Sequence, residues 1–463
     1  MTSTPSFSES ITSEGVLDRI TALRAPKKLR ALELALIIFA FAITAAGVVI
    51  VDLTVLDQIG TALVPSGLAF MGAVLVLHFV VRAVATDADP LLIPLATVLS
   101  GLGVVQIYRI DVAYKSTGWQ ATSVRQLVWL TIAVLVASAI LLIIRNHMYL
   151  FKYTYLTGLG ALVLLILPML PGIGREKHGA RVWIEIGEYI SFQPGEIAKI
   201  LLSIFFAGYL IGNREALSMA GKKILGIVFP RGRDLGPLLV FWLASMSVLI
   251  FQRDLGTSLL YFGLFLSMLY VATGRTGWLV LGIGLFLFGG IAASQMFDYV
   301  NNRFQNWLHP FADPLGTGYQ MVQGLFGLAN GGIFGTGLGS GFPQDTPLSQ
   351  SDYILSSLGE ELGLIGLFMV LLTYLLLVGR GLRIGFAGQD NFGKLLSVGL
   401  AFSLGLQVFI VLGGITRVIP LTGLTAPFMA AGGSSLVSNW IIIALLLRLS
   451  NAVRNRPKLV IRA

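Results

Sequence analysis

Long apolar runs, separated by polar loops, fill most of this 463-residue chain. A helix that crosses a bilayer needs about 20 mostly apolar residues. We predict twelve such helices, near residues 31–51, 62–84, 89–108, 127–144, 149–168, 193–212, 237–251, 256–273, 276–296, 353–379, 394–413 and 427–449. The segment 237–251 is short and close to its neighbour, so the predicted range is ten to twelve. The pattern indicates an all-α polytopic integral membrane protein.

The composition excludes several classes of protein. Hydrophobic residues make up 55% of the chain and charged residues only 12%, whereas a soluble domain carries about 25% charged residues. The apolar runs do not alternate with polar residues, which argues against an outer-membrane β-barrel. The chain has no Cys and only four scattered His, so neither a thiolate nor a multi-histidine metal site is expected. No cofactor or nucleotide-binding motif is evident, and the need for a divalent cation stays open.

The distribution of basic residues predicts the orientation. Most of the 32 Lys and Arg residues fall on one side of the membrane if both termini are cytoplasmic, with clusters in 1–30, in 213–236 and from Arg448 onward. The positive-inside rule thus explains the net charge of +9 without a nucleic-acid partner. The head 1–30 precedes a run long enough to span, with no prompt cleavage site, so we interpret that run as a start-transfer anchor. The basic tail 451–463 is also predicted to be cytoplasmic.

Two loops on the opposite side of the membrane are longer than a simple connection requires. They are 169–192 and 297–352. Loops of such length without a core of their own are usually functional or disordered. The Gly-rich stretch GLFGLANGGIFGTGLGSGF in the second loop is too apolar for disorder. We expect packed, irregular or half-helical structure there, lying on the membrane surface or dipping into it.

Charged residues inside spans are costly and suggest function. Pro194 suits the first turn of a helix, and Glu196 and Lys199 follow it within a predicted span. Three residues apart, they share a helix face and can pair. One hypothesis is a self-neutralising pair at the membrane interface. The other, which we favour, is a polar wall of a cavity that receives a charged headgroup.

A second charged block consists of Arg253 and Asp254 in a short outer turn. They could simply end two helices, or they could face a ligand. Further cations lie on the outer side, where the positive-inside rule does not explain them. Scattered solvated charge would account for them, and so would a pyrophosphate substrate. These cations are Arg109, Lys115, Arg125, Arg175, Lys177, Arg181, Arg303 and Arg417.

A third charged block opens the predicted span 353–379. Ser351 or Asp352 could be the N-cap of its helix. Glu360 and Glu361 lie about 12–14 Å deeper, at 1.5 Å per residue. Two adjacent carboxylates at that depth must pair, be protonated or cap another element. We interpret them as mainly structural.

Five blocks in fixed order resemble the SEDS family (shape, elongation, division and sporulation), which includes RodA and FtsW. The blocks are WIEIGEYISFQPGEIAK (183–199), QRDLGTS (252–258), RFQNWLHPFADPLGTGYQMVQGLFGLANGGIFGTGLGSG (303–341), SDYILSSLGEELG (351–363) and PLTGLTAPFMAAGGSS (420–435). The order and spacing of the blocks, from about residue 89 to 449, carry the resemblance. The family commonly has His-Thr-Asp-Phe where this chain has Gln350, Ser351, Asp352 and Tyr353, so the carboxylate is retained.

The resemblance implies an activity, a substrate and partners. Proteins of this family are peptidoglycan glycosyltransferases that polymerise lipid II, an undecaprenyl-pyrophosphate-linked muropeptide, at the outer face of the bacterial cytoplasmic membrane. They act with a class B penicillin-binding protein, a transpeptidase, and with other membrane proteins of the elongation complex. The family core has ten spans, so 31–84 is expected to form two extra spans before a core at 85–450. We associate that extension with RodA-like proteins of actinobacteria.

The resemblance also implies site residues. Asp352 would act as base on the acceptor sugar hydroxyl, whose high pKa calls for one. Lys199 would hold phosphate and Glu196 would orient it, with Arg253 and Arg303 as further phosphate candidates, because cations stabilise the departing pyrophosphate. Gln193 and Ser351 complete the expected substrate-binding set.

Other functions remain open at this point. A lipid II flippase would need charges through the full membrane depth, whereas the charges here cluster toward the outer side. A scaffold without activity would not explain Asp352 together with the outer cations. A division polymerase of the FtsW kind is a further alternative, and the extra spans favour the elongation role.

Overall fold

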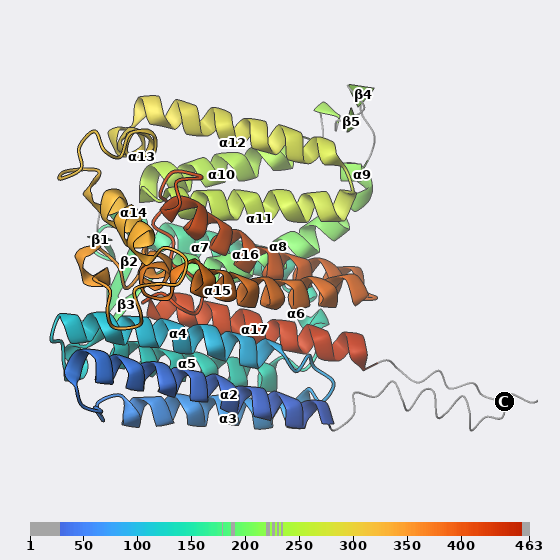
Figure 1. Ribbon diagram of the computed structural model, residues 1–463. Coiled ribbons are helices and arrows are strands. Elements are labelled where there is room, and N and C mark those ends of the chain that lie inside the picture. The colour runs from blue at the N-terminus through green and yellow to red at the C-terminus, as the bar shows by residue number, and fades with distance from the viewer. Residues whose placement is uncertain are drawn as a thin grey trace, which may run out of the picture.

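The protein is a bundle of long helices (Figure 1). The structure, a computed structural model, describes residues 28–177, 179–186, 190–218, 223–224, 227–228, 231–232 and 235–455. The cytoplasmic head predicted at 1–30 and the tail predicted at 451–463 fall largely outside these ranges.

Within the described ranges, ten helices are long and apolar enough to cross a membrane. They are α2 (Lys28–Val51, continued by the π-helical turn η1, Asp52–Leu56), α3 (Val64–Val84), α4 (Leu92–Ala113), α5 (Thr122–Ile143), α8 (Pro194–Gly212), α11 (Leu255–Thr273), α12 (Thr276–Met296), α15 (Ile354–Ala387), α16 (Asn391–Ile415) and α17 (Gly433–Arg454). Two shorter apolar helices are α7 (Thr154–Ile166, followed by η3, Leu167–Met169) and α10 (Gly236–Gln252). The polytopic helical fold is confirmed. The two shorter helices coincide with the predicted spans 149–168 and 237–251, and the total of twelve spans stays a prediction.

Short elements fill the connections. The helical ones are α6 (Met148–Lys152), η2 (Gly118–Gln120), α9 (Arg214–Ser218), α13 (Asp298–Leu308), α14 (Tyr319–Gly331) and η5 (Pro343–Asp345). The loop 169–192 contains an antiparallel sheet with the order β1 (Gly174–Lys177), β2 (Ala180–Ile186) and β3 (Ile190–Phe192). A second small sheet pairs β4 (Lys223–Ile224) with β5 (Ile227–Val228). The hydrophobic pattern predicts no strands here, because runs this short carry little periodic signal.

Different short elements lie at the two ends of the bundle. The sheet β1–β3 and the helices α13 and α14 gather at one end, and α6, α9 and the last turns of α17 lie at the other (Figure 1). Helix α15 packs against α16, α17 against α5, and α7 against α8. The loop predicted at 297–352 contains the helices α13 and α14. It lies at the same end of the bundle as the β1–β3 sheet (Figure 1).

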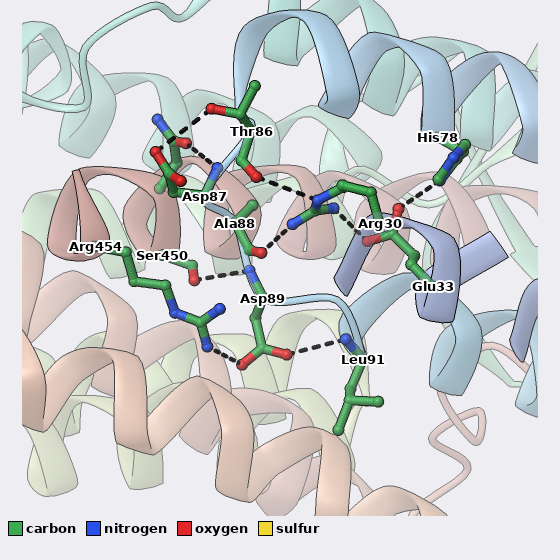
Figure 2. Close-up of polar contacts among 11 residues, drawn as sticks. Arg30, Glu33, His78, Thr86, Asp87, Ala88, Asp89, Leu91, Ser450 and Arg454 are labelled. Carbon is green, nitrogen blue, oxygen red and sulfur yellow. Dashed lines mark hydrogen bonds and ion pairs between the residues drawn. The ribbon is translucent and has the colours of Figure 1, made fainter. Parts of the chain in front are cut away.

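The first two helices pack mainly on the rest of the bundle, α2 on α4 and α3 on α5. A buried polar cluster ties them there (Figure 2). Arg30 donates to the carbonyls of Thr86, at 3.2 Å, and Ala88. Glu33, which is fully buried, pairs with Arg30 and lies 2.7 Å from Nδ1 of His78. Buried charges are tolerated only when paired in this way.

The same cluster continues to the last helix. The carboxylate of Asp89 pairs with Arg454 at 2.9 Å, and the backbone N–H of Asp89 donates to Ser450 (Figure 2). Arg380 of α15 approaches the same carboxylate at 3.5 Å. The connection between α3 and α4 is thus joined to α15 and α17.

The Gly-rich stretch packs against a kink in α15. Gly363 interrupts that helix with φ 67 and ψ −172. The backbone groups around the kink pair with the stretch 332–337: Leu364 donates to Gly332, Ile365 to Ile333, Thr336 to Glu360 and Gly337 to Glu361. A Cβ on Gly335, which has φ +85, would lie 2.2 Å from the carbonyl oxygen of Glu361. Glycine is needed because two backbones touch, and the expectation of packed, partly helical structure is confirmed.

The two adjacent carboxylates of α15 are both held inside the protein. Glu361 pairs with Arg109 at 3.0 Å. Glu360 accepts hydrogen bonds from Asn330 at 3.2 Å and from the backbone of Phe342 at 2.9 Å. The structural interpretation of both residues is confirmed. Arg109 is buried in this pair, so the alternative in which it is a solvated loop charge is wrong.

Candidate functional site

A small cavity lies where α8 begins. Its volume is about 10 Å³, room for about one water molecule. It is lined by Gln193, Gly195, Glu196, Lys199, Thr257, Leu260, Tyr261 and Leu424. Three of these, Gln193, Glu196 and Lys199, are predicted substrate-binding residues, and the structure brings them together.

The local sequence explains why these groups face inward. Pro194 occupies the first turn of α8, where a missing N–H is harmless. Glu196 follows in that turn, where a negative charge interacts favourably with the helix dipole. Lys199 stands one turn further on the same face and pairs with Glu196 at 2.7 Å.

The ammonium of Lys199 has three protein acceptors. Besides Glu196, it donates to Oε1 of Gln407 at 2.9 Å and to Oδ1 of Asn439 at 3.0 Å. Its side chain is 1% exposed. An ammonium has three N–H donors, so all of them are used within the protein. Lys199 therefore joins α8 to α16 and α17, and a ligand oxygen could bind it only by displacing one of these acceptors.

The loop between α16 and α17 contributes Leu424 to the lining of the cavity. Gln407 donates to the carbonyl of Thr425 at 2.9 Å, and the hydroxyl of Thr425 meets that of Ser435 at 3.1 Å. Ser438 lies 3.3 Å from the Glu196 carboxylate. The polar groups of the cavity are thus ordered by neighbours on three elements.

Asp254 adds a second carboxylate near Glu196. It is the N-cap of α11 and accepts from the backbone of Thr257 at 2.9 Å and from its hydroxyl at 2.5 Å. Burial raises the pKa of the Asp254 carboxyl, as does the charge of Glu196, while the bonds from Thr257 and the charge of Arg303 oppose that rise. The alternative in which 253–254 is a turn that ends two helices is confirmed, because Arg253 is the C-cap of α10 and Asp254 is the N-cap of α11.

Asp352 lies near Gly423, the residue before the cavity-lining Leu424. Its Oδ2 lies 3.6 Å, and Nη2 of Arg303 3.8 Å, from the position a Cβ on Gly423 would occupy. Arg303 of α13 also donates to the carbonyl of Leu421 at 2.9 Å. Because Gly423 has no side chain, the Asp352 carboxylate and the Arg303 guanidinium can both lie close to its backbone, although they come from distant parts of the chain.

Asp352 is not the N-cap of α15. The N-cap is Tyr353, and its side chain makes no capping bond. Asp352 is half-buried, just before the helix. The capping hypothesis for Ser351 and Asp352 is therefore wrong. The neighbouring hydroxyl of Ser351 donates a hydrogen bond to the carbonyl oxygen of Leu348 at 3.4 Å.

Arg253 lies away from the cavity. It pairs with Glu176 of the β1 strand at 3.7 Å, and its guanidinium lies 5.9 Å from the ring centre of Tyr299. Half of its side chain is exposed, at 51%. Arg253 therefore contacts the β1–β3 sheet, at the same end of the bundle as Asp352.

Four residues around the cavity are absent from the predicted substrate-binding set: Asp254, Gln407, Asn439 and Tyr261. Tyr261 donates to the carbonyl of Gly195 at 2.8 Å. The signal was present, because Gln407 and Asn439 are amides within predicted spans, where an unpaired polar group is costly.

The site contains no group of three or more His, Cys, Asp or Glu side chains placed to hold a metal ion, and the same holds elsewhere in the residues that the structure describes. The donor groups that line the cavity are the Lys199 ammonium, the Gln193 amide and the hydroxyls of Thr257 and Tyr261, and the Arg303 guanidinium lies near Gly423. They suit an anionic or hydroxyl-bearing ligand.

Comparisons with known proteins place this architecture in a family. A family model for cell cycle proteins, FtsW/RodA/SpoVE, matches residues 90–455. The chain is 44% identical over 428 residues to the peptidoglycan glycosyltransferase RodA of Mycobacterium tuberculosis (strain ATCC 25618 / H37Rv), covering 92% of this chain and 91% of that protein. It is 32% identical over 380 residues to the stage V sporulation protein E of Bacillus subtilis (strain 168), covering 80% and 98%.

Solved structures agree. A chain from a peptidoglycan synthase complex, described as coordinating polymerization and crosslinking, has a TM-score of 0.62 at 27% identity and covers 80% of this chain and 99% of that one. A variant of the rod shape determining protein RodA of Thermus thermophilus has a TM-score of 0.56 at 25% identity, with the same coverage. The resemblance of the five sequence blocks is thereby confirmed: the chain belongs to the FtsW/RodA/SpoVE family, which is the SEDS family.

Proposed function

We propose that this chain polymerises lipid II into glycan strands at the outer face of the bacterial cytoplasmic membrane during cell elongation, with Asp352 as its catalytic carboxylate. Its activity is that of a peptidoglycan glycosyltransferase, as the identity of 44% over 92% of the chain to a relative of that name supports. The elongation role rests on the same relative, which is named RodA.

One observation carries the proposed site. Asp352 and Arg303, from separate parts of the chain, both approach Gly423, close to the cavity at the start of α8. Glycosyl transfer needs a base near the attacking hydroxyl and positive charge near the departing pyrophosphate. A carboxylate and a guanidinium within reach of one point supply both.

The proposed reaction is a direct displacement. Asp352 accepts the proton of the acceptor sugar hydroxyl while that oxygen attacks the anomeric carbon of the donor. The bond from that carbon to the pyrophosphate oxygen breaks, and undecaprenyl pyrophosphate leaves with the electron pair. Arg303 stabilises the charge that gathers on the leaving group. Such a displacement requires no covalent intermediate on the enzyme, which agrees with the absence of Cys from the chain.

The remaining predicted residues take supporting roles in this proposal. Glu196, Lys199 and Gln193 line the cavity and are assigned to the binding of the headgroup. Lys199 already donates to three acceptors within the protein, so in this proposal it mainly positions Glu196. It binds phosphate only if a phosphate oxygen displaces one of these acceptors. Ser351 and Arg253 are assigned to the rim.

The protein spans the membrane several times. We further propose that both termini are cytoplasmic, which places Gln305 of α13 outside and Lys152 of α6 inside. The Cys-free chain allows single-Cys variants. A membrane-impermeant maleimide applied to intact cells should label Gln305→Cys and leave Lys152→Cys unlabelled. The opposite pattern would invert the topology.

A transpeptidase of the penicillin-binding class is the proposed partner, together with other membrane proteins of the elongation complex. The support is the structural similarity to a chain from a synthase complex that couples polymerization with crosslinking. No nucleic-acid partner is proposed, since the positive-inside rule accounts for the basic residues.

The test is polymerisation of lipid II by the purified protein with its transpeptidase partner. Asp352→Asn keeps the shape of the side chain but removes the base, and should lower the rate by about 10²–10⁴-fold. Asp345→Asn, an exposed position in the same loop, is the matched control and should retain the wild-type rate. Near wild-type polymerisation by Asp352→Asn would refute the catalytic assignment. Transport of lipid II across vesicles without polymerisation would favour a flippase.

A further inference from the structure

The segment that carries Asp352 is anchored on both sides at Gln350. The side-chain amide of Gln350 donates from Nε2 to Oδ1 of Asp111 at 3.0 Å. Its backbone carbonyl accepts a hydrogen bond from the N–H of Ala431 at 2.8 Å. Gln350 is two residues from Asp352, so these two bonds fix the backbone next to the catalytic carboxylate.

Asp111 is itself held rigidly. It lies in the last turn of α4, only 2% exposed. Its second oxygen, Oδ2, accepts from the backbone N–H of Ser123 at 2.6 Å. The N-cap of α5 is Ala121, which has no side chain that can cap, so an N–H in the first turn of α5 takes its acceptor from α4. A carboxylate at a helix N-terminus is also favoured by the helix dipole.

Helix α5 also fixes the second anchor. Gln126, one turn after Ser123, donates to the carbonyl of Ala430 at 3.0 Å and accepts from the N–H of Gly432 at 3.4 Å. The residue between them is Ala431, the donor to Gln350. The start of α5 thus forms hydrogen bonds with the Asp111 carboxylate and with the loop at 430–432. These are the two groups that contact Gln350.

The backbone turn that contains Gln350 and Asp352 is held by two hydrogen bonds to one carbonyl group. Leu348 has φ 57, and its carbonyl accepts from Ser351 at 3.0 Å and from Tyr353 at 3.2 Å. Asp352 stands between these two donors. A shift of Gln350 therefore moves the Asp352 backbone, because the turn between them has little freedom to absorb it.

We propose that Asp111, acting through Gln350, is a positioning residue that fixes the Asp352 carboxylate relative to Arg303 in lipid II polymerisation. Asp111 acts through Gln350, so its effect is on the rate of the chemical step and not on substrate affinity. This inference rests on the proposed function of the site.

The experiment measures kcat and KM for lipid II with the purified protein and its transpeptidase partner. Gln350→Met keeps the length of the side chain but cannot donate to Asp111. Asp111→Asn removes one of the two acceptor oxygens. Each should lower kcat by about 10²-fold, the effect of misplacing a catalytic group by about 1 Å, with KM close to the wild-type value.

A swapped pair separates positioning from general damage. In Asp111→Asn combined with Gln350→Glu, the introduced amide can donate to the introduced carboxylate and still accept from the N–H of Ser123. The hydrogen bond is then restored with donor and acceptor exchanged. We expect kcat within a few-fold of wild type, whereas Gln350→Glu alone opposes two carboxylates and should have the lowest kcat.

The controls keep the outcomes distinct. Gln305→Met, an exposed glutamine on α13, should not change kcat. The amount of folded protein is measured for every variant by size-exclusion chromatography in detergent. Wild-type kcat in Gln350→Met, loss of kcat only in proportion to loss of folded protein, or failure of the folded swapped pair to recover would each overturn the positioning role. If the wild-type protein fails to polymerise lipid II, or Asp352→Asn is fully active, the proposed function fails instead.

Discussion

Replacement of Lys199 by Met should damage both the folding and the activity of this protein. The side chain is 1% exposed and contacts three acceptors, Glu196 at 2.7 Å, Gln407 at 2.9 Å and Asn439 at 3.0 Å. Methionine fills a similar volume but offers no N–H. The substitution therefore leaves a buried carboxylate and two amide oxygens without their donor.

The expected size of the effect follows from that arrangement. Breaking a buried ion pair by removing one partner costs about 3–5 kcal/mol, and a buried polar group that loses its hydrogen bond costs about 1–3 kcal/mol. These contributions overlap because the three acceptors share one donor. We take about 3–5 kcal/mol as the loss in folding free energy.

The assay compares Lys199→Met with Lys152→Met, which removes an exposed ammonium on α6. Thermal inactivation in detergent, followed by size-exclusion chromatography, reports stability, and lipid II polymerisation per folded molecule reports activity. The α6 variant should match wild type, since exposed charges contribute about 0–1 kcal/mol. Wild-type stability of Lys199→Met would refute the reasoning about its three acceptors.

A reciprocal exchange sharpens this test. Glu196→Lys with Lys199→Glu keeps an ion pair but places the ammonium one turn away from Gln407 and Asn439. If only charge neutrality matters, the exchange restores stability and activity. We expect neither to recover, because the two amides remain without a donor. Full recovery would reduce Lys199 and Glu196 to a simple ion pair.

Two further predictions concern other parts of the fold. Gly335→Ala should destabilise the protein strongly, since the φ of +85 alone costs about 1–3 kcal/mol and the new Cβ would lie 2.2 Å from a carbonyl oxygen of α15. The control for backbone strain alone is Gly118→Ala, because Gly118 has φ +57 and no atom within 4 Å of its Cβ position. The stability of both variants is measured by thermal inactivation. The hydrogen bond from His147, at 3.0 Å, lowers the pKa of Asp390 below its usual 3.8, so this carboxylate stabilises the fold above that pH and its contribution is lost as the pH falls through the lowered value. Asp390→Asn should flatten the acid side of the stability profile, and an unchanged profile would contradict the assignment.

The local sequence was sufficient to predict the membrane helices, because a run of apolar residues and the thickness of a bilayer are both local properties. It also predicted the fate of Glu360 and Glu361, since two adjacent carboxylates at that depth cannot both face lipid. The motif order identified the family. The positions of Glu196 and Lys199, three residues apart on one helix, predicted their ion pair.

The partners of these groups were decided by the tertiary structure. Gln407 and Asn439 lie more than two hundred positions after Lys199 in the sequence, and no local pattern indicates which helices cross there. Nor does apolar character reveal which helices are central. Helix α4 is less apolar than α2, yet 83% of its apolar window is buried against 22% for α2.

The physical reason is that lipid and protein interior are both apolar, so hydropathy does not distinguish a helix face that meets lipid from one that meets another helix. Only the packing decides. It placed Arg109 against Glu361 instead of toward solvent, and it brought Asp352 and Arg303 to the same glycine from separate parts of the chain. The sequence therefore determined which residues needed partners, and the tertiary structure determined which partners they found.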